Sequence, residues 1–148
     1  RSCGIRLKGK GFYCMKKYEN YAANLKVLSS AKNEDLSNEF IISGIIDKFF
    51  IQFELGWKLL KELMKYEGNS QAASGSPRAI IKEAYASYSF LDETLWLSML
   101  EARNDMTHIY NGNAARDMVE TILEEYIPAF EELKRKLEEL YGEQIKKF

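Results

Sequence analysis

The sequence predicts an all-α fold, an antiparallel bundle of four long helices with one additional short helix. Two observations support this prediction: hydrophobic residues recur three and four positions apart along most of the chain, and patterns typical of β-strands are nearly absent. A third is that loop and capping residues, such as Ser76-Pro77 and Asn111-Gly112, separate the periodic segments. The length of 148 residues suits one domain with a single core.

The first fourteen residues differ from the rest of the chain. They contain three glycines, four basic residues and no acidic residue, and they show no helical period. A clean helical pattern begins at Met15. Two explanations stay open: translation of the native protein begins at Met15 and residues 1–14 are upstream or added sequence, or these residues are a disordered N-terminus. The bundle domain is expected to span residues 15–148.

The first two helices are expected at about Met15 to Ala31 and about Leu36 to Glu67. In the first, Tyr18, Tyr21, Ala22, Leu25 and Leu28 share one face. In the second, one arc collects the apolar positions and should face the core; these are Ile42, Ile45, Ile46, Phe49, Phe50, Phe53, Trp57, Leu60, Leu63 and Met64. On the opposite side, Ile51 and Leu55 are either isolated exposed residues or part of a second contact surface such as a dimer interface.

Residues 68–76 form a loop by composition, and Ser76 and Pro77 are typical of a helix start. The short third helix is expected at about Pro77 to Ser87, and the fourth at about Asp92 to Tyr110. The fifth is expected at about Ala114 to Leu140, where Pro128 must kink or divide it. Its apolar stripe contains Ile122, Tyr126, Ala129, Leu133, Leu137 and Leu140.

Composition excludes several classes of function. A net charge of −1 argues against a broad basic surface for nucleic acid. The absence of an apolar run of about 20 residues indicates no membrane span, and the absence of a secretory signal makes the cytoplasm the default location. The two cysteines, Cys3 and Cys14, are no disulfide framework.

Cofactor and metal motifs are also missing. Cysteine–histidine ligand pairs are absent after residue 14, which disfavours zinc, and the chain has no glycine-rich phosphate loop. Gly75-Ser76 is not followed by the paired aspartates that a nucleotidyltransferase needs for its metals. We therefore expect no metal or organic cofactor, and we do not expect this chain itself to be a nucleotidyltransferase.

The fourth expected helix places a charge on its apolar face. On a helical wheel, Trp96, Met99, Leu100, Met106 and Tyr110 all fall within about 60° of Arg103. A guanidinium in that position is costly unless it is paired. The alternatives are a buried ion pair, for example with Glu54, a face that opens to water at a subunit contact, or a site that needs a fixed positive charge.

The only histidine, His108, lies about 140° from Arg103 on the same wheel and borders the apolar face. A histidine can transfer a proton near neutral pH, and an arginine can stabilise charge on a phosphate. Together they are the minimum for metal-independent RNA cleavage by attack of the 2′-hydroxyl. A two-fold dimer would place two such histidines across a shared cleft. The alternative is that both residues are structural.

The pattern R-x-x-x-x-H-x-Y, here Arg103, His108 and Tyr110, resembles the signature of the HEPN superfamily. The flanking segments resemble the nucleotidyltransferase substrate-binding protein family, in the same order, over about Met15 to Leu140. These segments are Phe53-Glu54-Leu55, Trp57-Lys58, Leu60-Lys61, Ser76-Pro77-Arg78, Trp96, Met99-Leu100, Arg103-Asn104, Tyr126 and Pro128-Ala129-Phe130.

The resemblance implies a HEPN-like helical bundle that forms a homodimer and associates with a minimal nucleotidyltransferase. The chain would be the substrate-binding subunit of that pair, which is of the toxin–antitoxin type, with a nucleotide or RNA as the further ligand. Alternatively, it would be an RNase toxin in which Arg103 and His108 are catalytic, Asn104 supports the site, and adenylylation of Tyr110 silences it. A non-catalytic adaptor is the remaining alternative.

Overall fold

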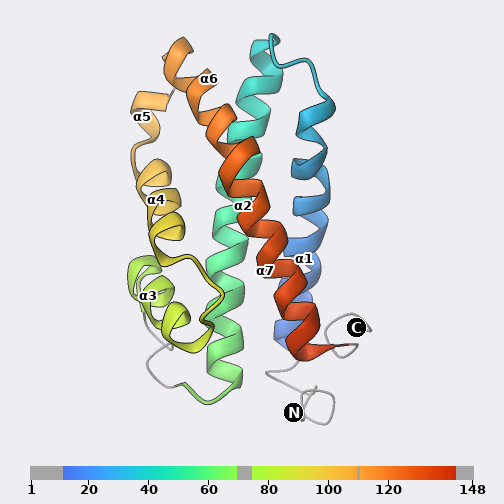
Figure 1. The fold of residues 1–148 in the computed structure, drawn as a ribbon, viewed down its shortest axis with the longest axis vertical. Coiled ribbons are helices and arrows are strands. Elements are labelled where there is room, and N and C mark those ends of the chain that lie inside the picture. Colours follow the sequence, from blue (N-terminus) through green and yellow to red (C-terminus); the bar gives the residue numbers. More distant parts are fainter. Residues whose placement is uncertain (1–11, 70–74, 110, 143–148) are drawn as a thin grey trace.

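The computed structural model describes residues 12–69, 75–109 and 111–142; the side chains of residues 12–15 and of His108 are outside the described set. Within these ranges the chain is helical and contains no strand, which confirms the predicted all-α bundle (Figure 1). The elements are α1 (Phe12–Ser29), a 3₁₀ turn (Ser30–Asn33), α2 (Glu39–Tyr66), α3 (Pro77–Ser87), α4 (Glu93–Asn104), α5 (Met106–Ile109), α6 (Gly112–Thr121), a π-helical segment (Ile122–Tyr126) and α7 (Ile127–Tyr141).

The long elements alternate in direction, as Figure 1 shows: α1, α2, α4 and the α6–α7 rod run antiparallel in turn. Helix α2 is central, since it packs against α1, α3, α4 and α6, while α7 packs against α1. Helix α3 is the additional short helix, beside one end of α2. Helix α1 begins at Phe12, three residues before the predicted start; residues 1–11 of the expected lead-in lie outside the described residues.

The predicted core face of α2 is confirmed. Of the ten residues on that arc, all are buried except Phe50, which is half-buried and packs against the core. The helix begins at Glu39 rather than Leu36 because Asn38 is its N-cap. The Asn38 side chain accepts hydrogen bonds from the backbone of Phe40 at 2.8 Å and of Ile41 at 3.4 Å.

A close approach joins α2 to α4. The side chain of Trp96 is 1% exposed and packs edge-on against Phe130 of α7, with ring centroids 5.5 Å apart. A Cβ added to Gly56 would lie 2.9 Å from Trp96 Cη2 and 3.2 Å from a ring carbon of Tyr21. Gly56 therefore makes room for two rigid rings, and it sets how closely α4 and α1 approach α2.

One polar side chain in the described core is completely buried. Gln52 Nε2 donates to the Tyr21 carbonyl oxygen at 3.1 Å, and Asn24 Nδ2 donates to Gln52 Oε1 at 2.7 Å. The Tyr21 hydroxyl in turn donates to the Phe130 carbonyl oxygen at 2.8 Å. These bonds satisfy buried polar groups and fix the register of α1 against α2 and α7.

The expected fifth helix is divided, as Pro128 required. The backbone N–H of Ile127 donates to the carbonyl of Ile122, five residues back, so the π-helical segment inserts one extra residue before the proline. A wider turn relieves the clash between a proline ring and the carbonyl four residues earlier. The predicted stripe holds on both sides of this segment as far as Leu137, but its last member is wrong: Tyr141 is 6% exposed, whereas Leu140, which was predicted to lie on the stripe, is 52% exposed.

Candidate functional site

The fourth helix is shorter than predicted and ends just after Arg103. Helix α4 stops at Asn104, and Asp105 leaves the helical conformation with φ −104° and ψ 37°. Helix α5 then starts at Met106. Asn and Asp side chains compete for backbone hydrogen bonds, which favours a break here. The prediction of one unbroken helix across Asp105 is therefore wrong. The angle of about 140° between Arg103 and His108 assumed that helix and stays a prediction.

Arg103 forms an ion pair with Glu54 of α2, as one alternative of the sequence analysis proposed. Its Nη2 lies 2.5 Å from Glu54 Oε2, and its Nη1 donates to Asn104 Oδ1 at 3.2 Å. The partner is the expected one, but the prediction that the pair is buried is wrong, because the two side chains are 30% and 29% exposed. The fold thus brings together Arg103, Glu54 and Asn104 at a position that solvent reaches.

Two further residues of α2 hold Glu54 in place. Trp57 Nε1 donates to Glu54 Oε1 at 3.2 Å, and Lys58 Nζ lies 3.7 Å from the same oxygen. The other oxygen, Oε2, is inaccessible to water, and its contact with Arg103 is an ion pair without the alignment of a hydrogen bond. One carboxylate thus lies between two cations, and we call Glu54, Lys58 and Arg103 the charged cluster; its formal charge sums to +1.

The charged cluster is suited to hold an anion. Arg103 offers a fork of N–H donors, and Lys58 a mobile ammonium. Glu54 partly cancels these charges, so a phosphate would compete with the carboxylate for Arg103. The sequence analysis did not assign Lys58 and Trp57 to the site. The signal that could have found them is their spacing of four and three residues from Glu54 on one helix.

The remaining predicted site residues lie at or beyond the end of α4. His108 belongs to α5, a short helix that packs on α6, but its side chain is outside the described set. Tyr110 is not among the described residues. Of the apolar face predicted around Arg103, Trp96, Met99 and Leu100 are buried, while Met106 is 43% exposed because the helix ends before it.

The described part of the chain offers no metal centre. It contains no group of three or more His, Cys, Asp or Glu residues placed to hold a metal ion. A separate property concerns membranes: within the same residues, no helix has the length and the apolar character needed for a membrane span.

Fold and site together define an all-helical bundle with a partly exposed charged cluster between two of its helices. The chain belongs to the family described as nucleotidyltransferase substrate binding protein like, whose family model matches residues 15–139. This match confirms the resemblance to the nucleotidyltransferase substrate-binding protein family that the sequence segments indicated. A comparison with curated proteins gives no match.

Proposed function

We propose that this chain is the partner subunit of a separate minimal nucleotidyltransferase, and that it works in a toxin–antitoxin-like pair. The observation that carries the proposal is the family match over residues 15–139, which spans the bundle except for the first three residues of α1 and the last two of α7. The sequence after Gly75-Ser76 lacks the paired aspartates that a nucleotidyltransferase needs, and the described residues contain no group of three or more His, Cys, Asp or Glu placed to hold a metal ion. A second chain would therefore provide the transfer chemistry.

Within such a complex, the charged cluster would contact the phosphate-bearing substrate. Three features support this role: a formal charge of +1, exposure of about a third of the Arg103 side chain, and a location at the end of α4. The carboxylate of Glu54 holds Arg103 in position and would be displaced as the phosphate binds.

The subunit would act as a homodimer. Ile51 on α2 is 48% exposed, while Leu55 is half-buried and packs against the core, so Ile51 is the stronger support for a second contact surface. The proposal predicts that Ile51→Asp shifts the chain toward the monomer in light scattering after gel filtration. An unchanged molar mass would show that Ile51 is not part of a dimer interface.

The partnership is tested by co-expressing the chain with a minimal nucleotidyltransferase from the same genome. We expect the two proteins to elute together, and we expect Arg103→Glu to weaken nucleotide-dependent transfer by the complex. Arg135→Glu on α7 is a matched control, since Arg135 is an exposed arginine that also pairs with glutamates. Separate elution of the wild-type proteins would contradict the proposal.

The alternative function is a metal-independent RNase. It is favoured by one observation: Arg103 is partly exposed at a helix end, five residues before the only histidine. Proton transfer by His108 and stabilisation of the phosphate by Arg103 would cleave RNA and leave 2′,3′-cyclic phosphate ends. Adenylylation of Tyr110 would silence this activity by adding bulk and negative charge.

The two functions separate in one assay. Purified chain is incubated with total RNA in EDTA, beside His108→Ala, after mass spectrometry establishes that Tyr110 is unmodified. Cleavage by the wild type alone supports the RNase. Intact RNA in both samples would contradict the RNase and favour the proposal that the chain is a binding subunit. Glu54→Gln adds a second measurement: removing the competing carboxylate should raise RNA affinity if Arg103 binds phosphate.

A further inference from the structure

The N-terminal half of α2 presents an apolar stripe to solvent. Among the large apolar side chains that the structure describes, Phe40 is the most exposed at 89%, and Ile51, about three turns further along the helix, is 48% exposed. Gly44 and Asp47 lie between them, and these four residues fall within an arc of about 60° on the helix. We call Phe40, Gly44, Asp47 and Ile51 the outer stripe of α2. A phenyl ring so exposed, in line with a second apolar side chain, is typical of a contact surface.

A hollow of about 300 Å³ lies beside Phe40, where α2 packs against α1. Most of its lining residues are apolar, and one of them, Val27 of α1, is itself 52% exposed. Gly44 leaves the wall of the hollow open, because a Cβ built there meets no atom within 4 Å. The outer stripe therefore combines two projecting apolar side chains with a depression that has room for an aliphatic side chain.

The middle of the outer stripe carries charges that have no partner within the chain. Asp47 is exposed, and its neighbour Lys48 is half-buried at the edge of the hollow. Among the residues that the structure describes, neither side chain forms an ion pair. They do not pair with each other, because adjacent residues point about 100° apart on a helix. A surface that offers one anion beside one cation is complementary to a reversed copy of itself.

The spacing of these features fits a second copy of α2 in antiparallel orientation. In one register, Phe40 lies opposite Ile51 of the second copy, which enters the hollow beside the ring. In the same register, Gly44 lies opposite Asp47 of the second copy. Lys48 of one copy then comes within about one helical turn of Asp47 of the other. A parallel arrangement would instead place Asp47 against Asp47, which is repulsive.

We propose that the outer stripe of α2 is the interface of a two-fold homodimer, in which two α2 helices pack antiparallel and Phe40 of each copy contacts Ile51 of the other. The proposal rests on the homodimer of the proposed function and names the surface that forms it. Burial of the phenyl rings and isoleucines stabilises the dimer. Two ion pairs between Asp47 and Lys48 of opposite copies select the antiparallel register.

Sedimentation velocity of the full chain over a concentration series tests the apolar part of the interface. The wild type should shift from monomer to dimer as the concentration rises. Phe40→Ala should raise the dissociation constant of the dimer about a hundredfold, because a symmetric interface loses the contact twice. Tyr85→Ala is the matched control, since Tyr85 is also an exposed aromatic residue but lies on α3. It should leave the dissociation constant unchanged.

Charge reversal tests the register. Asp47→Lys and Lys48→Asp should each weaken the dimer about tenfold, because each places like charges together across the two-fold axis. The double variant restores two pairs of opposite charge and should recover most of the wild-type affinity. This recovery requires contact between the copies, since the two residues do not pair within one chain. A double variant as weak as the single ones would overturn the proposal.

The remaining outcomes separate this interface from the proposed function. A dimer of unchanged affinity in Phe40→Ala would overturn the interface alone. A wild type that stays monomeric at every concentration would overturn both the interface and the homodimer. Loss of co-elution with the nucleotidyltransferase in Phe40→Ala, with the dimer unchanged, would assign the outer stripe to that protein instead. Failure of the wild-type proteins to co-elute would contradict the partnership, while the dissociation constants would still decide the interface.

Discussion

Helices α2 and α4 meet at two points that differ in almost every physical respect. At the first, Gly56 receives the ring of Trp96, and the contact is tight, apolar and closed to water. At the second, Glu54 pairs with Arg103, and both side chains are nearly a third exposed. The two points are only two residues apart on α2. The difference teaches that the apolar contact fixes the distance between the helices, and thereby holds the charged groups within reach of each other.

The largest expected effect comes from removing the Trp96 side chain from its contact with Gly56. Trp96→Ala should lower the free energy of unfolding by about 3–5 kcal/mol, because it removes a large ring from the core and leaves a cavity. Urea unfolding measures the loss. Tyr85→Ala on α3 is the control, since Tyr85 is 46% exposed, and should change stability by less than about 0.5 kcal/mol. Similar losses in both variants would refute the special role of Trp96.

A smaller effect is expected from adding a methyl group at Gly56 in the same contact. Gly56→Ala should destabilise the fold by about 1–2 kcal/mol, since the new methyl group meets two rigid rings and the strain exceeds the gain in helix propensity. Gly44→Ala is a matched control in the same helix, because a Cβ there has no neighbour within 4 Å. It should stabilise by up to about 1 kcal/mol. Thermal unfolding of both variants would show opposite shifts.

Alkaline pH should weaken the core around Tyr21. Burial raises the pKa of Tyr21 well above its ordinary value, so the folded chain keeps a proton that the unfolded chain loses above about pH 10. Stability is therefore fully present below pH 10 and falls above it, by up to ~1.4 kcal/mol per pH unit for this group. Urea unfolding of the wild type and Tyr21→Phe across this range should give a shallower decline in the variant; parallel declines would contradict the assignment.

The smallest effect on stability is expected at the second point. A double-mutant cycle with Glu54→Ala and Arg103→Ala should give a coupling energy of only about 0.2–1 kcal/mol, because solvent screens a partly exposed pair. The same substitutions should clearly change partner-dependent activity. A coupling of several kcal/mol would show that the ion pair belongs to the structural core after all.

Much of the bundle could be predicted because helical periodicity records which face is buried. The arc from Ile42 to Met64 and the start of α3 at Pro77 are two examples. Two features of the fold were not predicted from the sequence. The apolar pattern continues past Asp105, so periodicity does not reveal the helix break there. The burial of Tyr141 in place of Leu140 is the second, because both residues lie about one turn after Leu137 and spacing alone does not choose between them.

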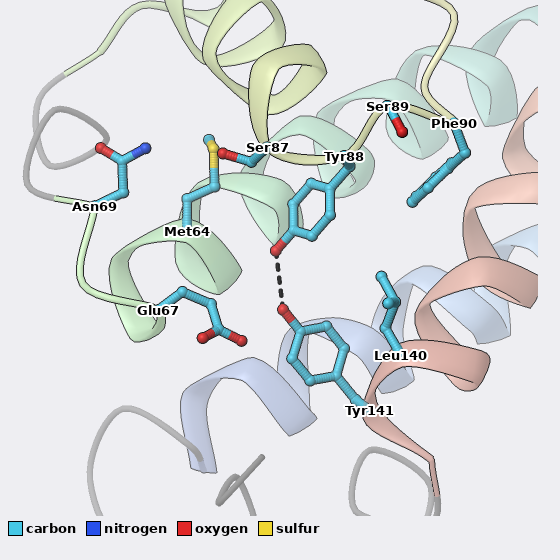
Figure 2. A pocket seen from close by; sticks show the side chains of 9 residues that line it. All are labelled: Met64, Glu67, Asn69, Ser87, Tyr88, Ser89, Phe90, Leu140 and Tyr141. Carbon is cyan, nitrogen blue, oxygen red and sulfur yellow. Dashed lines mark hydrogen bonds between the residues drawn. The ribbon is translucent and has the colours of Figure 1, made fainter.

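The site was predictable to a similar degree. A guanidinium on an apolar face is costly unless it is paired, and Glu54 was named as an example of a partner in one of three open alternatives. Lys58 could also have been predicted, because it lies four residues after Glu54 on the same helix, but the sequence analysis did not use this spacing. A pocket of about 410 Å³ near Tyr88, at the end of the bundle where α2 and α7 finish (Figure 2), could not have been predicted, because Glu67, Tyr88 and Tyr141 lie far apart in the sequence and no local pattern connects them.

The π-helical segment also sets the rotation between two halves of one rod. Helix α7 packs against α1, whereas α6 packs against α2 and α5. Deleting one residue from the segment would turn α6 by about 100° relative to α7. Val119, now 4% exposed, would leave its contact, and the end of α6 that carries the connection to α5 would point elsewhere. Chain length at 122–126 is therefore as strict a requirement as side-chain identity, and protein engineering at the α5 end must keep this segment intact.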